Sequence, residues 1–566
     1  MKRILSIVAV ALLVAACAQV PPVATPPATP QASATVEVKI IAFNDFHGNL
    51  KTPSLLVPVP DSTQSTGIRF DPAGGVEQFS ALVQSLKAKN RNVAVVSAGD
   101  MVGATPLLSA LFNDEPTIEA MNQVGIDFHA VGNHEFDYDP PHLKRLRYGG
   151  CKVDKKTAKP DCGGRPPYAG ARFEFLAANV IEIATGQTLF PAYAVKEFDG
   201  IKVGFIGLTT RTTPAIVRPG GAVGLTFKDE VETINALVPV IRAQGIEAIV
   251  VLMHEGGNQT GGVNECINFS GPGRQIAEKL DPAIQIVVTA HTHRYYICEV
   301  GNKLVTSAGS YGTLVTEIDL VLDRASRKIV SRTARNLIVD PKGSKDPTLT
   351  ALVDRYAALS APLENRVVGK VTREVNTVVG RSGESTLGNM LADAHLFGTA
   401  APDKGGAVIA FNNPGSRLRA PIIPDSDGGV KYGDLFKVQP FQNDLITMTL
   451  TGKQITGLLE QQFSDRDTPR LLHVSKGFSY TWDAAKPIGE KVVPGSVKLN
   501  GAPLLADLQY RVTANRFLAD GSEGMTLFLD GTDRQVGIID HEALVEMIAA
   551  SSPYTPPLVG RLTRLN

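Results

Sequence analysis

The sequence carries no excess charge of either sign, and tryptophan occurs only once among its 566 residues. Lys and Arg together number 56, as do Asp and Glu, so no overall field favours a nucleic-acid polymer or an anionic surface as a partner. Phenylalanine, with 22 residues, is therefore the main aromatic side chain for stacking. A hydrophobic share of 43% and a charged share of 20% are typical of a soluble globular protein, and the length allows two or more domains.

The N-terminus lacks an apolar run long enough to cross a bilayer. Lys2 and Arg3 precede an apolar segment from Ile4 to Ala16, shorter than the ~20 residues of a membrane-spanning helix. The end of this segment and Cys17 resemble a bacterial lipoprotein signal, which implies cleavage before Cys17 and attachment of lipid to its thiol. A plain secretory signal cut near the same place is the alternative. Ala18 after the cysteine indicates, by analogy, the outer membrane.

We therefore predict a signal peptide at residues 1–16 and a tether at residues 17–35. From Val20 to Ala34 the chain consists mainly of Pro, Ala, Thr and Ser, a composition that stays extended and does not pack into a core. The predicted protein is exported and attached to a lipid bilayer of the cell envelope through Cys17, at the outer membrane or in the periplasm.

Cysteine is scarce, with five residues in all. Without Cys17 four remain, an even number in a protein predicted to be exported, and this favours disulfides. Of the three possible pairings, Cys151–Cys162 and Cys266–Cys298 is favoured, because each bond joins neighbours within one insertion or one strand–helix unit. A zinc site made of these four cysteines is the alternative, but the short C-x-x-C spacing is missing.

From Val36 onward, segments with strand and helix patterns alternate, which predicts an α/β layered domain with its site at the carboxyl ends of the strands. The predicted strands are Val36–Phe43, Asn92–Ser97, Phe173–Asn179, Lys202–Gly207, Ala248–Met253 and Ile284–Thr289, with a further strand ending at Val131. The predicted helices are Val76–Lys89 and Glu115–Val124. This first domain is assigned to residues 36–340, and its last part, from Asp323, is expected to consist of turns.

A connector helix and a second domain follow. Residues 341–366 form the predicted connector, with helical spacing from Thr348 to Leu359 and a stop at Pro362. Residues 367–566 form the predicted second domain. Its expected strands are Val408–Phe411, Leu445–Leu450, Val492–Leu499 and Gln509–Ala514, and its expected helices are Leu387–Leu396, Gly452–Phe463 and Glu542–Ala549.

Polar side chains follow the predicted strands of the first domain in a repeated manner. These residues are Asp45, His47, Asp100, Asn133, His134, His254, His291 and His293. A lone histidine after a strand is usually a surface residue, but five in equivalent positions are hard to explain by packing. Mixed nitrogen and oxygen ligands suit Zn, Mn, Fe or Co rather than Ca or Mg. Asp137, three residues after His134, is placed to orient that imidazole by a hydrogen bond.

These motifs resemble the calcineurin-like metallophosphoesterases and, more narrowly, the bacterial secreted 5′-nucleotidase family, which includes UDP-sugar hydrolases. The resemblance implies a four-layer α/β/β/α sandwich, a connector helix and a smaller α/β substrate-binding domain. It also implies two divalent metal ions, with Zn, Mn or Co as the expected ions. The first would take Asp45, His47 and His293, the second Asn133, His254 and His291, and Asp100 would bridge them.

The second domain carries further motifs of this family. Arg381 begins R-S-G-E-S-T-L-G-N, and Asn412 and Arg417 bound N-N-P-G-S-R, which matches the family pattern imperfectly. Phe441 and Phe517 fall where the family places two phenylalanines that stack on a nucleobase, although core packing is the alternative for each. Glu523 replaces the aspartate that the family pattern expects at the ribose hydroxyls.

The resemblance implies hydrolysis of nucleoside 5′-monophosphates to nucleoside and phosphate, with His134 stabilising charge on the phosphoryl group or the leaving group. Alternatives of the same class are a 2′,3′-cyclic-nucleotide phosphodiesterase/3′-nucleotidase and a UDP-sugar hydrolase. A more distant alternative is a thiosulfohydrolase, which shares the metal site but would not need the paired phenylalanines. A nucleoside-binding surface lipoprotein without activity is the non-enzymatic alternative. The sequence leaves open whether the protein is a monomer or a dimer.

Overall fold

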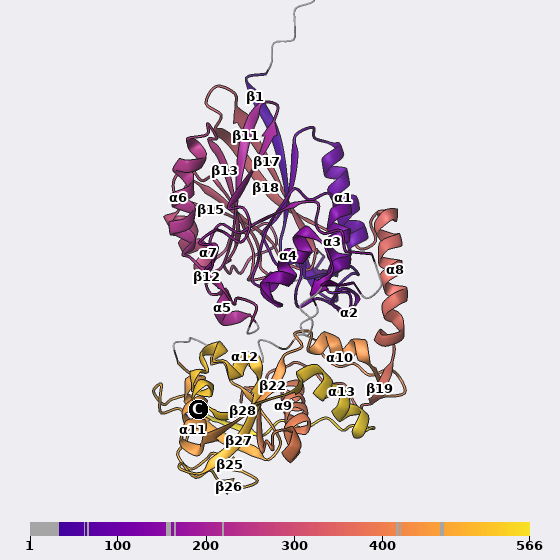
Figure 1. Ribbon diagram of the computed structural model, residues 1–566, viewed down its shortest axis with the longest axis vertical. Coiled ribbons are helices and arrows are strands. Elements are labelled where there is room, and N and C mark those ends of the chain that lie inside the picture. The colour runs from indigo at the N-terminus through magenta and orange to yellow at the C-terminus, as the bar shows by residue number, and fades with distance from the viewer. Residues whose placement is uncertain are drawn as a thin grey trace, which may run out of the picture.

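The computed structural model describes residues 33–566, apart from 61–62, 65–66, 154–159, 163–165, 218–219, 415–417, 419 and 465–468. The predicted signal peptide, nearly all of the tether, Cys17 and Arg417 therefore lie outside the described residues. Within the described chain, no helix is both long enough and apolar enough to span a bilayer. Figure 1 shows two α/β domains, with α8 running along one side from the first to the second.

Two six-stranded sheets form the centre of the first domain. The first has the order β18–β17–β1–β4–β5–β8, in which β1, β4, β5 and β8 run parallel. Its strands are β18 Ile329–Ile338, β17 Leu314–Asp323, β1 Thr35–Phe43, β4 Val93–Ser97, β5 Phe128–Ala130 and β8 Glu174–Leu176. The second has the order β10–β11–β13–β14–β16–β15. Its strands are β10 Tyr193–Phe198, β11 Ile201–Thr209, β13 Ala248–His254, β14 Ile286–Thr289, β16 Lys303–Ala308 and β15 Tyr295–Val300.

Helices cover the outer faces of both sheets, so the domain has four layers, α/β/β/α. Alternate residues of β1 separate two cores: Ile40 packs between the sheets with Phe205, whereas Phe43 packs against Phe79 of α1. The helices of this domain are α1 Val76–Ala88, α2 Leu107–Ala110, α3 Glu115–Val124, α4 Pro140–Tyr148, α5 Thr213–Ile216, α6 Glu230–Arg242 and α7 Pro272–Lys279. The predicted fold class is confirmed.

Short two-stranded sheets and two disulfides complete this domain. The pairs are β2 Leu56–Pro60 with β3 Ile68–Pro72, β6 Lys152–Val153 with β7 Pro160–Asp161, and β9 Val180–Glu182 with β12 Leu225–Phe227. Cys151 is bonded to Cys162 and Cys266 to Cys298, with Cα–Cα separations of 4.7 and 5.1 Å. The structure thus has the favoured disulfide pairing and not the zinc site.

The connector helix α8 spans Pro347–Glu364 and packs its buried side, including Leu352 and Tyr356, into the core of the first domain. The prediction that Pro362 stops the helix is wrong. Proline lacks only one N–H, and in the last turn its loss is tolerated, so the helix runs two residues further. The turns expected from Asp323 onward are also a wrong prediction in part, because β18 occupies Ile329–Ile338 there.

A five-stranded sheet of order β23–β20–β27–β22–β28 forms the centre of the second domain. Its strands are β23 His473–Val474, β20 Ile409–Asn412, β27 Gln509–Asn515, β22 Asp444–Thr451 and β28 Thr532–Ile539. A four-stranded sheet holds β26 Ala502–Pro503, β25 Lys498–Leu499, β24 Phe478–Asp483 and β29 Leu562–Leu565, and β19 Val367–Lys370 pairs with β21 Gly429–Lys431. The helices are α9 Thr386–Thr399, α10 Tyr432–Val438, α11 Gly452–Gln461, α12 Arg516–Ala519 and α13 Asp540–Ala550.

The strand predicted at Val492–Leu499 is wrong for most of its length. Only Lys498–Leu499 is strand, since Pro494 and Gly495 interrupt the β pattern with a turn.

Candidate functional site

A cavity of about 510 Å³ lies between the two domains. The first domain lines it with loops that follow its strands, and the second domain lines it from the opposite side. Nine of the predicted site residues are part of its wall: Asp100, Asn133, His134, Asp137, His291, His293, Asn412, Phe441 and Phe517. The cavity therefore joins predicted metal ligands and predicted substrate residues in one space.

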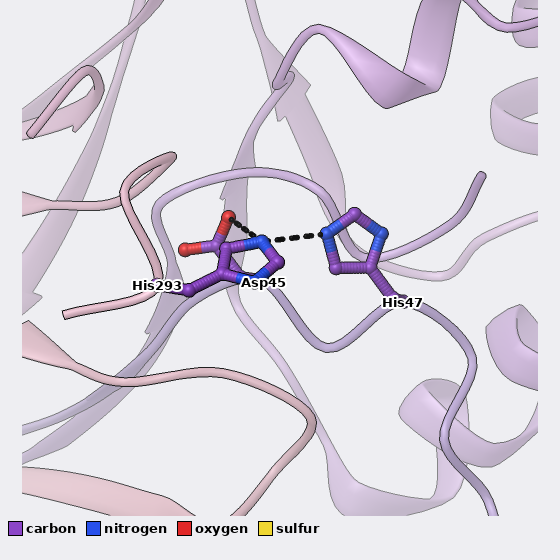
Figure 2. A group of neighbouring side chains, drawn as sticks. All are labelled: Asp45, His47 and His293. Carbon is purple, nitrogen blue, oxygen red and sulfur yellow. Dashed lines mark hydrogen bonds and ion pairs between the residues drawn. The ribbon is translucent and has the colours of Figure 1, made fainter. Parts of the chain in front are cut away.

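Asp45, His47 and His293 form a compact group at this edge of the first domain, as Figure 2 shows. The Nε2 atoms of His47 and His293 are 3.1 Å apart, and His293 Nε2 is 3.4 Å from Asp45 Oδ1. Asp45 and His47 come from the loop after β1, whereas His293 comes from the loop after β14 in the other sheet. The two-sheet sandwich thus brings together residues that are about 250 positions apart in the sequence.

A second group contains Asp100, His254 and His291. Asp100 Oδ2 lies 3.1 Å from Nε2 of His254 and 3.6 Å from Nε2 of His47, so this one oxygen faces both groups. Asn133 Oδ1 is 3.1 Å from His254 Nε2 and 2.9 Å from His291 Nδ1. The structure therefore places all seven predicted metal ligands together, with Asp100 between the two groups.

The hydrogen bonds behind these imidazoles show that the group fits a cation. His254 Nδ1 donates to the Ala98 carbonyl at 2.9 Å, and His47 Nδ1 donates to the Gly103 carbonyl at 2.8 Å. In the neutral rings the Nε2 lone pairs therefore face the Asp100 carboxylate. Acceptors that face one another repel unless positive charge lies between them, and a donor set of imidazole nitrogens with carboxylate and amide oxygens suits a transition-metal dication.

The ionisation of the cluster shows the same tension. Burial lowers the pKa of His254, but the adjacent Asp100 carboxylate overrides it and raises that pKa to about 10. Burial and the positive charge of His254 lower the pKa of His291 to about 3. Burial raises the pKa of Asp45, but the neighbouring histidines, led by His293, hold it well below its usual range. The buried Asp45 carboxylate thus remains anionic and attracts cations.

The backbone of the cluster is strained. Five of the seven predicted ligands have a positive φ, between 46° and 70°: Asp45, His47, Asp100, His291 and His293. Such left-handed conformations are costly for residues with a Cβ and accumulate at functional sites, where the surrounding fold holds them. Gly99 and Gly132 allow the close approach of these loops, because a Cβ at either position would collide with His254 or Asp100.

His134 points its reactive side into the cavity. Its Nδ1 donates to Asp137 Oδ2 at 2.8 Å, and the same oxygen accepts the Ala104 N–H at 3.0 Å. The predicted His134–Asp137 pair is therefore present, and it directs His134 Nε2 toward the cavity side. The ring of Phe441 stacks on that of His134, with centroids 6.0 Å apart, so the two domains touch at this point.

Glu135 is a residue of this motif to which the sequence assigned no role. Its buried carboxylate accepts from the backbone N–H groups of Gly132, Asp100 and Met101 at 2.5, 3.0 and 2.8 Å. It thereby ties the loop that carries Asp100 to the loop that carries Asn133 and His134. In the sequence, the only indication of a role for Glu135 was its position in the motif G-N-H-E.

Only some of the substrate-binding residues predicted in the second domain line the cavity. Asn412, Phe441 and Phe517 line the cavity. Arg381 does not line it, and its Nη2 donates to the Asn566 carbonyl at 3.1 Å. Glu523 is buried behind the wall and binds Nη1 of Arg470.

Several lining residues were missed. Arg470, Gln439, Asn443, Asn515 and Asp540 line the cavity without having been predicted. A usable signal existed for Asn515, which directly follows the predicted strand Gln509–Ala514. Arg470 had none, because it precedes a strand of only two residues.

Comparison with known proteins matches both domains. Residues 38–295 match the calcineurin-like phosphoesterases, and residues 367–530 match the 5′-nucleotidase C-terminal domain. Endonuclease YhcR of Bacillus subtilis is 30% identical over 532 residues, which cover 93% of this chain and 41% of that protein. Cell wall protein Lmo0130 of Listeria monocytogenes is 30% identical over 533 residues, covering 88% of this chain and 65% of that protein.

The chain thus spans less than two thirds of the length of these two relatives. Among solved structures, a 5′-nucleotidase precursor from Thermus thermophilus is 27% identical, with a TM-score of 0.71 and coverage of 94% of this chain and 99% of that one. This solved structure and the present chain therefore share both domains along nearly their whole length. The chain belongs to the 5′-nucleotidase family, in which a calcineurin-like phosphoesterase domain is joined to a 5′-nucleotidase C-terminal domain.

Proposed function

We propose that this protein hydrolyses nucleoside 5′-monophosphates to nucleoside and phosphate. The observation that carries the proposal is the shared cavity, whose wall combines the acid–histidine cluster of the first domain with Phe441 and Phe517 of the second. A phosphate at the cluster and a base at the phenylalanines would use both walls at once.

The proposed metal centre holds two divalent ions, with Zn, Mn or Co as the expected ions. Asp45, His47 and His293 would hold one, and Asn133, His254 and His291 the other, with Asp100 shared between them. When bound, such ions supply Lewis-acid activation of water and neutralise charge on the phosphoryl group. The strained, buried loops keep these ligands in place before substrate arrives.

His134 supplies the proton chemistry in this proposal. Asp137 holds its Nδ1–H, so Nε2 faces the cavity and, when protonated, can donate to a phosphoryl oxygen or to the leaving O5′. The charge of the imidazolium is stabilised by the Asp137 carboxylate behind it. Hydrolysis breaks the bond between phosphorus and O5′, water provides the new oxygen on phosphorus, and O5′ leaves as the nucleoside hydroxyl.

The second domain provides recognition. Phe441 and Phe517 would stack on the base, a contact worth roughly 1–3 kcal/mol that hardly discriminates between bases. Asn412 at the end of β20 supplies polar contacts, and Arg381 and Arg417 are proposed as further substrate-binding residues. For Arg381 this requires its side chain to leave Asn566, which lies in the same domain, and to reach the cavity.

We further propose that the chain is exported and anchored through a lipid on Cys17. The lipoprotein-like N-terminus, the two disulfides and a relative named as a cell wall protein support this proposal. Radiolabelled palmitate incorporated into the full chain, and lost in Cys17→Ser, would test it. No incorporation into the wild type would leave a plain secretory signal as the explanation.

The function is tested by phosphate release from AMP, 3′-AMP, 2′,3′-cyclic AMP, UDP-glucose and p-nitrophenyl phosphate, with metal supplied. A strong preference for AMP is the expected result. Preference for the cyclic nucleotide or UDP-glucose would replace it with the corresponding alternative. Because one relative is named an endonuclease, DNA belongs in the panel. Tight nucleoside binding without hydrolysis of any ester would indicate the binding lipoprotein instead.

A further inference from the structure

Arg470 is the one lysine or arginine among the described residues that line the cavity. Its side chain is 46% exposed, and its Nη1 donates to Glu523 Oε2. The side chain of Glu523 is only 1% exposed, so its carboxylate lies behind the guanidinium. At this place Arg470 therefore offers hydrogen-bond donors to the cavity. The Glu523 carboxylate, which could only accept, does not face the cavity.

The backbone and the guanidinium of Arg470 are each anchored within the second domain. The backbone N–H of Arg470 donates to the Gln462 carbonyl at 3.1 Å, and the buried Gln462 side chain accepts from Leu472 N at 2.5 Å. Glu523 lies in the turn Ser522–Gly524 with a φ of 60°, which directs its side chain inward toward Arg470. A preorganised arginine loses little conformational entropy when a ligand binds.

Arg470 retains donors for a ligand. A guanidinium has five N–H groups and no acceptor, and Nη1 carries the bond to Glu523. Among the described residues, no atom accepts a hydrogen bond from its Nε or Nη2. Two neighbouring N–H groups in one plane match the geometry of two phosphate oxygens.

Arg470 is linked through Glu523 to the part of the second domain that carries Phe517. Glu523 lies in the turn after α12, which carries Phe517, and Gly521 N donates to the Leu518 carbonyl of that helix at 2.9 Å. In the same turn, Ser522 Oγ donates to the Ala215 carbonyl of α5 in the first domain at 2.8 Å. Through Glu523, Arg470 is thus tied to the turn that follows α12, and this turn also contacts the first domain. With a base on Phe517 and a phosphate at His134, the ribose would lie between these two residues, in the cavity whose wall includes Arg470.

We propose that Arg470 binds a phosphate group on the ribose, so that nucleotides with a second phosphate at the 2′ or 3′ position are preferred substrates. Ribose hydroxyls both donate and accept, whereas phosphate oxygens accept, and a donor-only guanidinium matches the latter. Glu523 is then a positioning residue for Arg470. The proposal rests on the proposed function for the orientation of the nucleotide. Water cleaves the bond between the 5′ phosphorus and O5′, and the products are inorganic phosphate and the nucleoside 2′- or 3′-phosphate.

The test compares adenosine 3′,5′-bisphosphate with AMP in the metal-loaded full-length protein. The wild type should have a KM for the bisphosphate about tenfold below that for AMP, as expected for charge-assisted hydrogen bonds. In Arg470→Gln the KM values for the bisphosphate and for AMP should become equal. Glu523→Gln should reduce the ratio of the two KM values as well, and the double variant should lose no more than Arg470→Gln alone, because both substitutions act on one contact.

A matched control is Arg242→Gln. Arg242 is 44% exposed and pairs with Glu247 at 2.9 Å, but it lies on α6, away from the cavity between the domains. This variant should retain the ratio. Arg470→Lys keeps a positive charge without the planar fork and should give an intermediate ratio, and it serves if the glutamine variant folds poorly.

The inference is overturned if Arg470→Gln changes the KM of both nucleotides by the same factor, or if it changes neither. Hydrolysis of p-nitrophenyl phosphate without hydrolysis of either nucleotide would instead refute the proposed function. In that case the dissociation constants of the bisphosphate and AMP, measured by titration calorimetry, decide the role of Arg470. A tenfold preference that depends on Arg470 supports the inference, and equal affinities reject it.

Discussion

The two walls of the cavity differ in how their predicted residues relate to the sheets beneath them. In the first domain, the candidate ligands follow β1, β4 and β5 of one sheet and β13 and β14 of the other, which are neighbouring strands in each case. In the second domain, Asn412 ends β20 and Phe517 follows β27, and both line the cavity. Arg381 and Glu523, which do not line it, are separated from these strand ends by helices, turns or loops.

The difference teaches that a polar residue at a strand end is easier to place than one in a motif alone. Parallel strands carry their carboxyl ends to one edge, so residues that follow them converge whatever their distance in the sequence. Asn515 and Asp540, which end β27 and follow β28, obey the same rule and line the cavity, although no motif indicated them. The chemistry of the first wall is also confined to a strained and buried cluster, whereas the second wall depends on side-chain contacts that span several loops.

The largest expected effect is on the first wall. Asp100→Asn should reduce metal affinity by more than about 100-fold, because one carboxylate oxygen serves both groups and even indirect supports of a metal site contribute 10- to 100-fold. Metal analysis of the purified variant measures this. Asp114→Asn is the control: Asp114 is buried nearby, bound to Thr105 and Ser109, and outside the cluster. Full metal occupancy in Asp100→Asn would disprove the shared position.

His134→Ala should retain its metal and lose about 10²–10⁴-fold in kcat, the usual contribution of a positioned acid or base. Asp137→Asn should lose less, because it removes charge from behind the imidazole and leaves the ring in place. Measurement of kcat at saturating AMP, together with the metal content of each variant, separates a loss of proton transfer from a loss of metal. A loss of metal in His134→Ala would assign that residue to the first-domain cluster as a ligand.

The second wall has a pH-sensitive core. Burial lowers the pKa of His395 to about 4, and burial with the charge of Arg561 does the same for His473. In the unfolded chain these two histidines bind a proton near pH 6.5, whereas in the folded protein they do so only near pH 4. Stability should therefore fall as the pH is lowered through this window, by about 3 kcal/mol for each histidine at most.

Urea unfolding between pH 7 and 4 measures this loss. His395→Asn preserves a donor for the Phe411 carbonyl, which His395 Nδ1 now holds at 3.0 Å, but it cannot titrate. This variant should lose less stability on acidification than the wild type. An identical pH dependence in the two proteins would mean that His395 does not contribute.

The smallest effect is expected at the stacking ring. Phe517→Ala should raise the KM for AMP about tenfold, since stacking on one face of a base contributes 1–3 kcal/mol. Ribose 5-phosphate, which has no base, is the control substrate, and its KM should change little. Equal losses on the two substrates would show that Phe517 supports the fold of α12 and does not bind the base.

Much of the fold was accessible from local patterns. The strand at β1 and the helix at α3 were predicted nearly to the residue, because a continuous apolar pattern and a regular helical period determine such elements. The predicted strand at Val492–Leu499 failed because Pro494 and Gly495 outweigh the valines around them. The continuation of α8 beyond Pro362 is the opposite case, because the packing of α8 keeps the chain helical at a residue that usually ends a helix.

The sequence by itself determined most of the elements, the disulfide cysteines and the polar turns of the first wall, since these depend on residues close together in the chain. Only the tertiary structure decided which side chains meet across the cavity. Arg470 and Glu523 are 53 residues apart, and whether Glu523 faces a ligand or a guanidinium depends on how two loops pack. Such contacts are set by long-range packing of the whole domain, which no local pattern of residues records.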